Sequence, residues 1–288
     1  MSCATALASG TAWGKRSDKA IRKRIGIMSI CFDPVLKTAS HPGDANHTLD
    51  VMDFADMIAQ HYGVHLVQFQ QTDFISTDPA YLAQLLGRVK KAKSKVNQIN
   101  VEFANLNVSA RDPVIRLETI ELTKAWIDRA VALECPRVMV AQGNLPLAQR
   151  QTAIDTLKVI NAYAKTKNVF ITMEPRWRAD AQNVPWDLFV DVLKASGTYC
   201  NPDCGNFPDR ASRDAALPIM YRMTSGSSHA KSIPEKFDTA SALKISKEAG
   251  YTGDYTIEAR ANNGPDPYAA VQSIMDILLA NLEEGGRT

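Results

Sequence analysis

The stretch VFITMEP, residues 169–175, is a run of apolar and β-branched residues that ends near a glutamate, Glu174. Three later stretches repeat this pattern of a strand-like run with a polar side chain close to its end. They are TYCNPD (198–203) with Asp203, SSHAKS (227–232) with His229, and YTIEAR (255–260) with Glu258. The four polar residues are 29, 26 and 29 positions apart. Each interval is about one strand, one helix and their loops, so we predict that each residue lies on a successive βα unit.

The same alternation extends back toward the N-terminus. Further strands are predicted at 24–30, 64–69, 99–106 and 137–142, which makes eight in all. Helices are predicted at 48–61, 79–95, 114–134, 147–166, 187–196, 209–221, 237–249 and 266–283. No two strand runs follow each other as a hairpin, so the strands are expected to be parallel. We therefore predict an α/β fold, a single (β/α)₈ TIM barrel over residues 24–288, preceded by a disordered tail at 1–23.

Composition narrows the class of protein. The chain has 288 residues, of which 45% are hydrophobic and 22% charged, and its net charge is +2. This balance is typical of a globular protein with a full core and offers no basic stripe for nucleic acid. No stretch reaches the ~18–20 apolar residues of a membrane span. We expect no nucleic-acid partner and no membrane partner.

The cysteines and the first residues bear on location. Five cysteines, an odd number at scattered positions, favour reduced thiols in a cytoplasmic enzyme. The apolar opening MSCATALASGTAW lacks the charged and long apolar regions of a signal peptide. The alternative is that it is the remnant of an export signal, which would make the protein periplasmic.

The donor types indicate a metal site. Carboxylate oxygen and imidazole nitrogen suit a hard or borderline divalent cation such as Mn, Mg, Co or Zn. We predict that Glu174, Asp203, His229 and Glu258 bind one such ion, since the carboxyl ends of barrel strands gather functional groups. Cys200 and Cys204 are alternative ligands, although packing is the favoured interpretation. The turn after the first strand, CFDPVLK, has no glycine, and no phosphate-binding motif occurs elsewhere, so no nucleotide cofactor is expected.

From about residue 24 onward the chain resembles the xylose isomerase-like barrel family, which includes sugar phosphate isomerases, D-tagatose 3-epimerase-type enzymes and inosose dehydratase. The resemblance is carried by YGVHLVQF (62–69), RLETIELTKAWIDRAVAL (116–133) and the ordered set MEP, PDCGNFP, HAK and IEAR. It implies the same four metal ligands, a glutamate, an aspartate, a histidine and a glutamate from strands five to eight. Two positions depart from the family pattern: Asn206 stands where many relatives have a histidine, and Gln68 where many have a glutamate. The zinc endonuclease branch, which needs several more histidines, is disfavoured.

The resemblance implies an isomerase or epimerase acting on a small sugar, sugar phosphate or keto-polyol. Such a reaction moves a proton next to a carbonyl through an enediolate, so Glu174 and Glu258 are predicted to be the acid/base pair. Substrate contacts are predicted from residues at strand ends, which are Gln142, Arg176, Asn206, Lys231 and Arg260. The cations among them could equally be ion-pair partners of the glutamates. A dehydratase or lyase, or a sugar-binding barrel without catalysis, fits the same residues, and whether the barrels form a homo-oligomer is left open.

Overall fold

The computed structural model describes residues 18–38, 43–176, 185–233, 238–260 and 264–282. Most of the predicted tail, residues 1–17, lies outside the described residues. Residues 18–22 are helical, Ile21 is buried in the core, and the Arg22 guanidinium donates to Tyr62 O.

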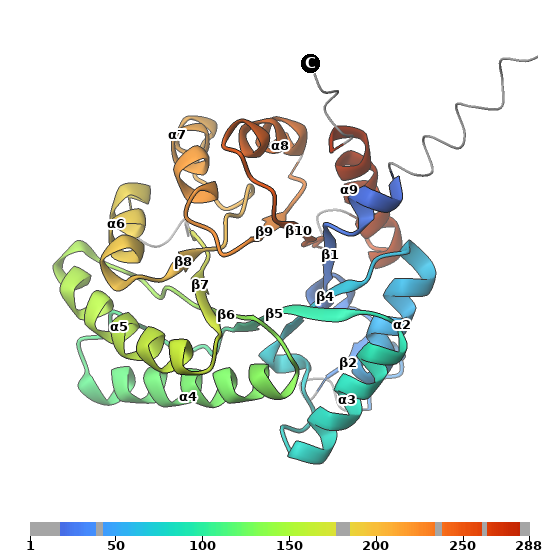
Figure 1. Cartoon of the computed structure of the whole chain (residues 1–288), viewed down its shortest axis with the longest axis horizontal. Helices are drawn as coiled ribbons and strands as arrows, with labels where there is room; N and C mark the ends of the chain where they lie inside the picture. Colours follow the sequence, from blue (N-terminus) through green and yellow to red (C-terminus); the bar gives the residue numbers. More distant parts are fainter. Residues whose placement is uncertain (1–17, 39–42, 177–184, 234–237, 261–263, 283–288) are drawn as a thin grey trace, which may run out of the picture.

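Eight parallel strands form the centre of the molecule, and helices surround them (Figure 1). In chain order the strands are β1 (Ile25–Met28), β4 (Leu66–Gln70), β5 (Lys95–Val101), β6 (Arg137–Val140), β7 (Phe170–Met173), β8 (Tyr199–Cys200), β9 (Ser227–Ala230) and β10 (Asp254–Ile257). Hydrogen-bonded neighbours run from β8 through β7, β6, β5, β4, β1 and β10 to β9. Single parallel bridges join Cys200 to Thr224 and Asp203 to His229. These bridges close the sheet between β8 and β9, which confirms the predicted barrel.

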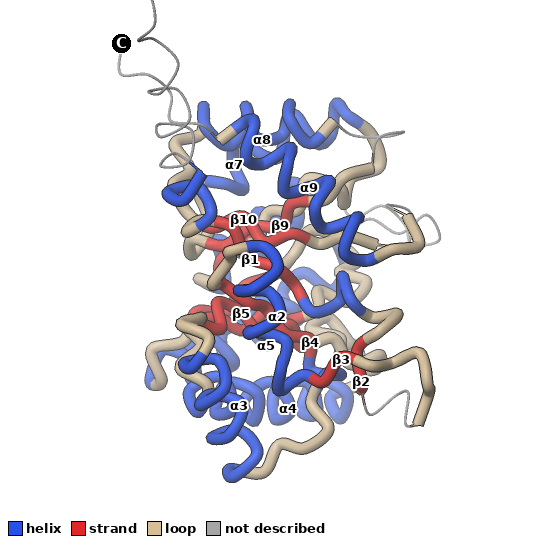
Figure 2. Tube along the Cα trace, turned by 90° about the vertical axis from the view of Figure 1, so that its right-hand side faces the viewer, coloured by secondary structure: helices blue, strands red, loops and turns tan. Residues whose placement is uncertain are grey.

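Helices cover the outside of the strands (Figure 2). They are α2 (Val51–Tyr62), α3 (Pro79–Lys91), α4 (Pro113–Ala132), α5 (Arg150–Thr166), α6 (Trp186–Ser196), α7 (Arg210–Tyr221), α8 (Thr239–Glu248) and α9 (Pro267–Asn281). Each lies within a few residues of a predicted helix. Aspartates precede several of them, and the side chains of Asp112 and Asp266 accept from the backbone N–H of the second residue of α4 and α9. A small parallel pair, β2 (Leu36–Lys37) and β3 (Leu49–Asp50), was not predicted.

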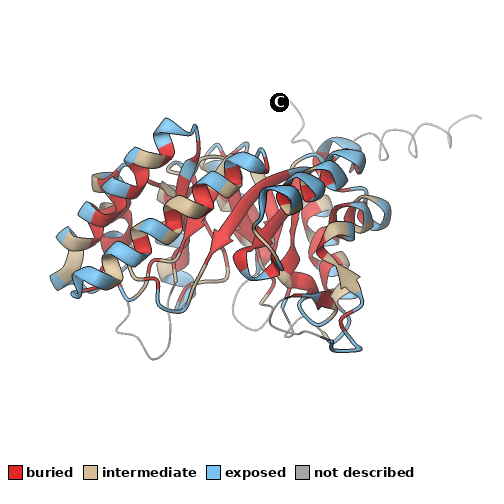
Figure 3. Cartoon of the chain, turned by 90° about the horizontal axis from the view of Figure 1, so that it is seen from below, coloured by how far each residue is buried: buried red, intermediate tan, exposed pale blue. Residues whose placement is uncertain are grey.

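Burial follows this layered arrangement. The strands and the inward faces of the helices are buried, whereas the outward faces of the helices are exposed (Figure 3). The core between strands and helices is apolar and includes Phe54, Phe69, Leu85 and Ile274. Removing this apolar surface from water is the main driving force that holds the helices against the barrel.

The interior of the barrel, by contrast, contains a chain of buried polar side chains. Gln68 donates to Asn100 Oδ1 (2.8 Å), and Gln98 donates to the same oxygen (3.0 Å) and to Asn201 Oδ1 (3.4 Å). Thr172 in turn donates to Gln98 Oε1 (3.2 Å). These residues come from β4, β5, β7 and the segment after β8, so their hydrogen bonds span the barrel interior. Each buried amide thus has at least one hydrogen-bond partner.

This polar interior explains one error in the predicted strands. The third strand was expected at 99–106, but β5 begins at Lys95 and ends at Val101. Asn97 and Gln98 make the first half of β5 look like a loop. They are buried because the barrel supplies partners for their amides, which the local sequence does not reveal.

Candidate metal centre

The four predicted ligands come together at the carboxyl ends of the last four strands. Glu174 directly follows β7, Asp203 follows β8, His229 lies within β9 and Glu258 directly follows β10. One ligand atom from each lies within 4.8 Å of those of the other three, and all four side chains are buried. In the part of the chain that the structure describes, these four side chains form a group that could hold a metal ion.

The histidine lies between the carboxylates. Its Nδ1 is 2.7 Å from Glu174 Oε1, 3.1 Å from Glu258 Oε2 and 3.8 Å from Asp203 Oδ2. Its other ring nitrogen, Nε2, is 2.7 Å from the side-chain amide of Gln68. Nδ1 therefore faces the shared centre, while Gln68 fixes the orientation of the ring from the opposite side.

These donors fit a single divalent cation. Three carboxylates and one imidazole are the ligand types of Mn, Mg, Co and Zn sites, and their separation is that of groups surrounding one ion. The group could therefore hold one metal ion, as the sequence predicted.

Two arginines pair with the two glutamates. Arg176 contacts Glu174 Oε2 (3.0 Å) and also pairs with Glu102, while Arg260 donates to Glu258 Oε1 (2.7 Å). Each arginine follows its glutamate by two residues, so the side chains emerge on the same side of the extended backbone. These contacts are the ion pairs that the sequence offered as an alternative to substrate binding.

The remaining predicted residues also reach this end of the barrel. The amide of Gln142, which follows β6, donates to the backbone oxygen of Arg176 (3.0 Å). The ammonium of Lys231 lies 2.7 Å from Asp203 Oδ2 and 3.0 Å from Asn206 Oδ1. The residues named as substrate contacts thus adjoin the carboxylates directly or through one neighbour.

The sequence did not single out Glu102. It was placed inside a strand, but it follows β5 and pairs with Arg176 at the mouth of the barrel. Glu102 directly follows the last residue of β5, as Glu174 and Glu258 directly follow their strands, and this position is the signal that could have identified it. Burial raises the pKa of Glu102, and the charge of Arg176 opposes this shift.

Charge and burial act in opposite directions on the ligands. Burial alone would raise the pKa of Glu258, but Lys231 and the hydrogen bond with His229 hold it at about 2. Lys231 and His229 likewise outweigh burial and lower the pKa of Glu174 well below its usual value. At Asp203 burial dominates and raises the pKa to about 6, despite Lys231. Both glutamates are therefore ionised at neutral pH.

The two cysteines near Asp203 pack in the interior. Cys200 and Cys204 are buried and lie outside the group of four. Burial raises the pKa of Cys200 well above its usual value and that of Cys204 to about 12, so both remain thiols. The Cys204 thiol donates to Lys231 O (3.4 Å).

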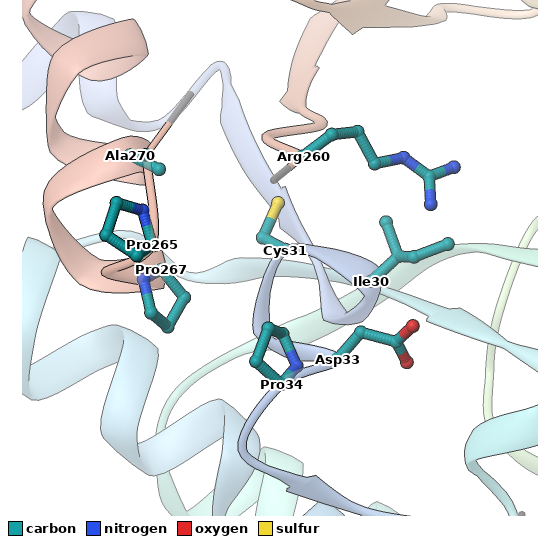
Figure 4. A pocket seen from close by; sticks show the side chains of 9 residues that line it. Ile30, Cys31, Asp33, Pro34, Arg260, Pro265, Pro267 and Ala270 are labelled. Atoms are coloured by element: carbon teal, nitrogen blue, oxygen red, sulfur yellow. The ribbon is translucent and has the colours of Figure 1, made fainter. Parts of the chain in front are cut away.

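A pocket of ≈ 400 Å³ lies beside the site, between the turn after β1 and the start of α9 (Figure 4). Arg260 lines it from one side and Pro265 and Pro267 from the other, with Cys31 between them. Its volume is within the range of small-molecule pockets. Arg260 also binds Glu258, so this residue connects the pocket with the carboxylate cluster.

Comparison with known proteins agrees with the fold. The model of the xylose isomerase-like TIM barrel family matches residues 57–199. The chain is a xylose isomerase-like TIM barrel. This confirms the resemblance found in the sequence. No curated protein sequence matches the chain.

Solved structures share the same barrel. The D-psicose 3-epimerase of Clostridium cellulolyticum H10 with D-tagatose has a TM-score of 0.71 and 14% identity, covering 90% of this chain and 99% of its own. An L-ribulose 3-epimerase has a TM-score of 0.69 and 16% identity, covering 92% and 99%. A xylose isomerase-like TIM barrel protein from Mycobacterium smegmatis in complex with magnesium has a TM-score of 0.63 and 16% identity, covering 90% and 98%. At these identities the likeness establishes the fold alone.

None of the described helices combines the length and the apolar character needed to cross a membrane.

Proposed function

We propose that this xylose isomerase-like barrel is a divalent-metal-dependent isomerase or epimerase of a sugar, sugar phosphate or related keto-polyol. The observation that carries the proposal is the buried group of Glu174, Asp203, His229 and Glu258 at the mouth of the barrel. Structural neighbours that are named as D-psicose 3-epimerase and L-ribulose 3-epimerase support the substrate class.

The two glutamates supply the proton transfer in this proposal. Both are ionised at neutral pH, so each can accept a proton from a carbon next to a carbonyl. Arg176 and Arg260 hold one oxygen of each carboxylate and thereby fix its direction. A divalent ion held by Glu174, Asp203, His229 and Glu258 would supply positive charge to balance the negative charge that develops when the proton is removed.

The polar residues around the glutamates orient the substrate. Asn206 and Lys231 lie on one side of the cluster, and Gln142 supports the backbone at Arg176 on another. We propose that these three side chains and the two arginines contact the hydroxyl, carboxylate or phosphate groups of the substrate. The pocket beside Arg260 provides room for the part of the substrate that does not react.

The test uses metal-free protein with and without added Mn²⁺, Mg²⁺, Co²⁺ or Zn²⁺ and a panel of keto-sugars in D₂O. We expect the proton next to the carbonyl to exchange with deuterium only when metal is present, and NMR measures this exchange. Glu174→Gln and Glu258→Gln should each lower kcat by ~10² to 10⁴. Glu248→Gln, which neutralises an exposed glutamate on α8 (65% exposed), is the matched control and should keep the wild-type rate.

Three outcomes contradict the proposal in different ways. Exchange that survives removal of metal would exclude metal dependence. Absorbance of a conjugated enone would show that water is lost and would favour a dehydratase. Binding of sugars without any exchange would favour a barrel that only binds its ligand.

A further inference from the structure

Lys231 places an ammonium group inside the carboxylate cluster. Its Nζ lies 2.7 Å from Asp203 Oδ2, 3.1 Å from Glu258 Oε1 and 4.0 Å from Glu174 Oε1. Only 12% of the side chain is exposed. Three of the four proposed metal ligands thus already surround a positive charge that belongs to the chain itself.

The same oxygens face both the histidine and the lysine. Asp203 Oδ2 and Glu174 Oε1 each lie within 4.0 Å of His229 Nδ1 and of Lys231 Nζ. A divalent ion bound through His229 and these oxygens must therefore lie close to the ammonium. Two cations a few ångströms apart repel each other strongly in a buried site, where water screens them little.

The Lys231 ammonium also has a hydrogen-bond partner outside the four proposed ligands. Its stem packs against Gly205, where an added Cβ would lie 3.0 Å from Lys231 Cβ and Cδ. Its Nζ also donates to Asn206 Oδ1 (3.0 Å), which is not one of the four ligands. The stem is held by close packing, while the ammonium can keep a hydrogen bond to Asn206 when it loses its contacts with the carboxylates.

We propose that Lys231 is a built-in counter-ion that takes the place of the metal in the metal-free protein and is displaced toward Asn206 when a divalent ion binds. The inference rests on the proposed metal site. It assigns Lys231 two effects that a substrate contact alone would not have. Lys231 stabilises the cluster without metal, and it weakens the binding of the ion because the ion must first displace it.

The test compares Lys231→Met and Lys231→Gln with the wild type. Both variants are purified with Mn²⁺ and then stripped with a chelator, and Mn²⁺ affinity is measured from the free-ion signal in electron paramagnetic resonance. We expect both variants to bind Mn²⁺ about tenfold more tightly or better, because the competing charge is gone. Without metal, both should unfold at a lower temperature than the wild type, since three carboxylates then share fewer counter-charges.

Lys244→Met is the matched control, because Lys244 is 78% exposed on α8 and pairs only weakly with Glu248 at 3.8 Å. It should change neither Mn²⁺ affinity nor metal-free stability. Equal or weaker Mn²⁺ binding by the Lys231 variants would overturn the inference alone. Absence of Mn²⁺ binding in every protein, the wild type included, would overturn the metal site and the inference together.

Discussion

Asp73 allows a quantitative prediction about stability. It ends the short helical turn after β4, is 2% exposed, and its Oδ2 accepts from Gln70 N (2.7 Å) and from the Ser29 hydroxyl. Burial raises its pKa from 3.8 to about 7. The unfolded chain therefore loses this proton near pH 4, whereas the folded protein keeps it until about pH 7. The protonated Asp73 therefore stabilises the folded state fully below about pH 4, and this contribution to the free energy of unfolding is lost as the pH rises to about 7.

The size of the effect follows from the two pKa values. The folded and unfolded pKa values of Asp73 differ by about three units, which corresponds to about 4 kcal/mol in the free energy of unfolding. About 3 kcal/mol of this change falls between pH 4.5 and 7.5. Asp73→Asn cannot ionise, yet its carbonyl can still accept from Gln70 and Ser29. The free energy of unfolding of the wild type should therefore fall, relative to this variant, by about 3 kcal/mol across that range.

Urea denaturation of the metal-free proteins at several pH values measures this difference. Asp78→Asn, which neutralises an exposed aspartate a few residues later, should leave the pH dependence of the wild type unchanged. The reasoning is refuted if the curves for the wild type and Asp73→Asn run parallel from pH 4.5 to 7.5, or if their difference has the opposite sign.

Two further predictions concern the metal and the backbone. Burial lowers the pKa of His229, but the neighbouring carboxylates, with Glu174 the largest contributor, raise it well above 6.5. Because a metal ligand must be deprotonated, metal binding should release about one proton at pH 7. Calorimetry in buffers of different ionisation enthalpy checks this, and identical binding heats in all buffers would contradict it. Gly253→Ala should destabilise the protein by about 1–3 kcal/mol, because the new Cβ would meet Gly226 O at 2.5 Å. Gly87→Ala within α3, where the new Cβ would have no heavy atom within 4 Å apart from its chain neighbours and the backbone of the helix, should instead stabilise the protein by about 0.5–1 kcal/mol in thermal unfolding. Similar melting temperatures for the two variants would refute the steric argument.

The barrel could be predicted because alternation of strand and helix is a local property of the sequence. Apolar runs such as VFITMEP specify a buried strand, and Gly63 and Gly197 end α2 and α6 in the left-handed conformation that a glycine adopts readily. The start of β5 was predicted wrongly because its amide side chains resemble loop residues in the sequence, and the partners that allow their burial come from other strands.

The grouping of the four proposed metal ligands could be predicted for a related reason. In a barrel of parallel strands, all carboxyl ends meet at one mouth, so intervals of about one βα unit bring Glu174, Asp203, His229 and Glu258 together. The resemblance to a known family reinforced this inference.

The ion pairs around the ligands could not be predicted in detail. Lys231 contacts Asp203 because β8 and β9 close the barrel, and Glu102 pairs with Arg176 across the ends of β5 and β7. Such contacts depend on strand register and on side-chain direction, which a single sequence does not specify.

Titration of the metal-free protein with Mn²⁺, followed by pulsed electron paramagnetic resonance, tests the metal centre most directly. We predict one ion per chain, with a nitrogen coupling from the imidazole that disappears in His229→Gln. Mn²⁺ bound without any nitrogen coupling, a coupling that persists in His229→Gln, or no bound ion at all would contradict this account.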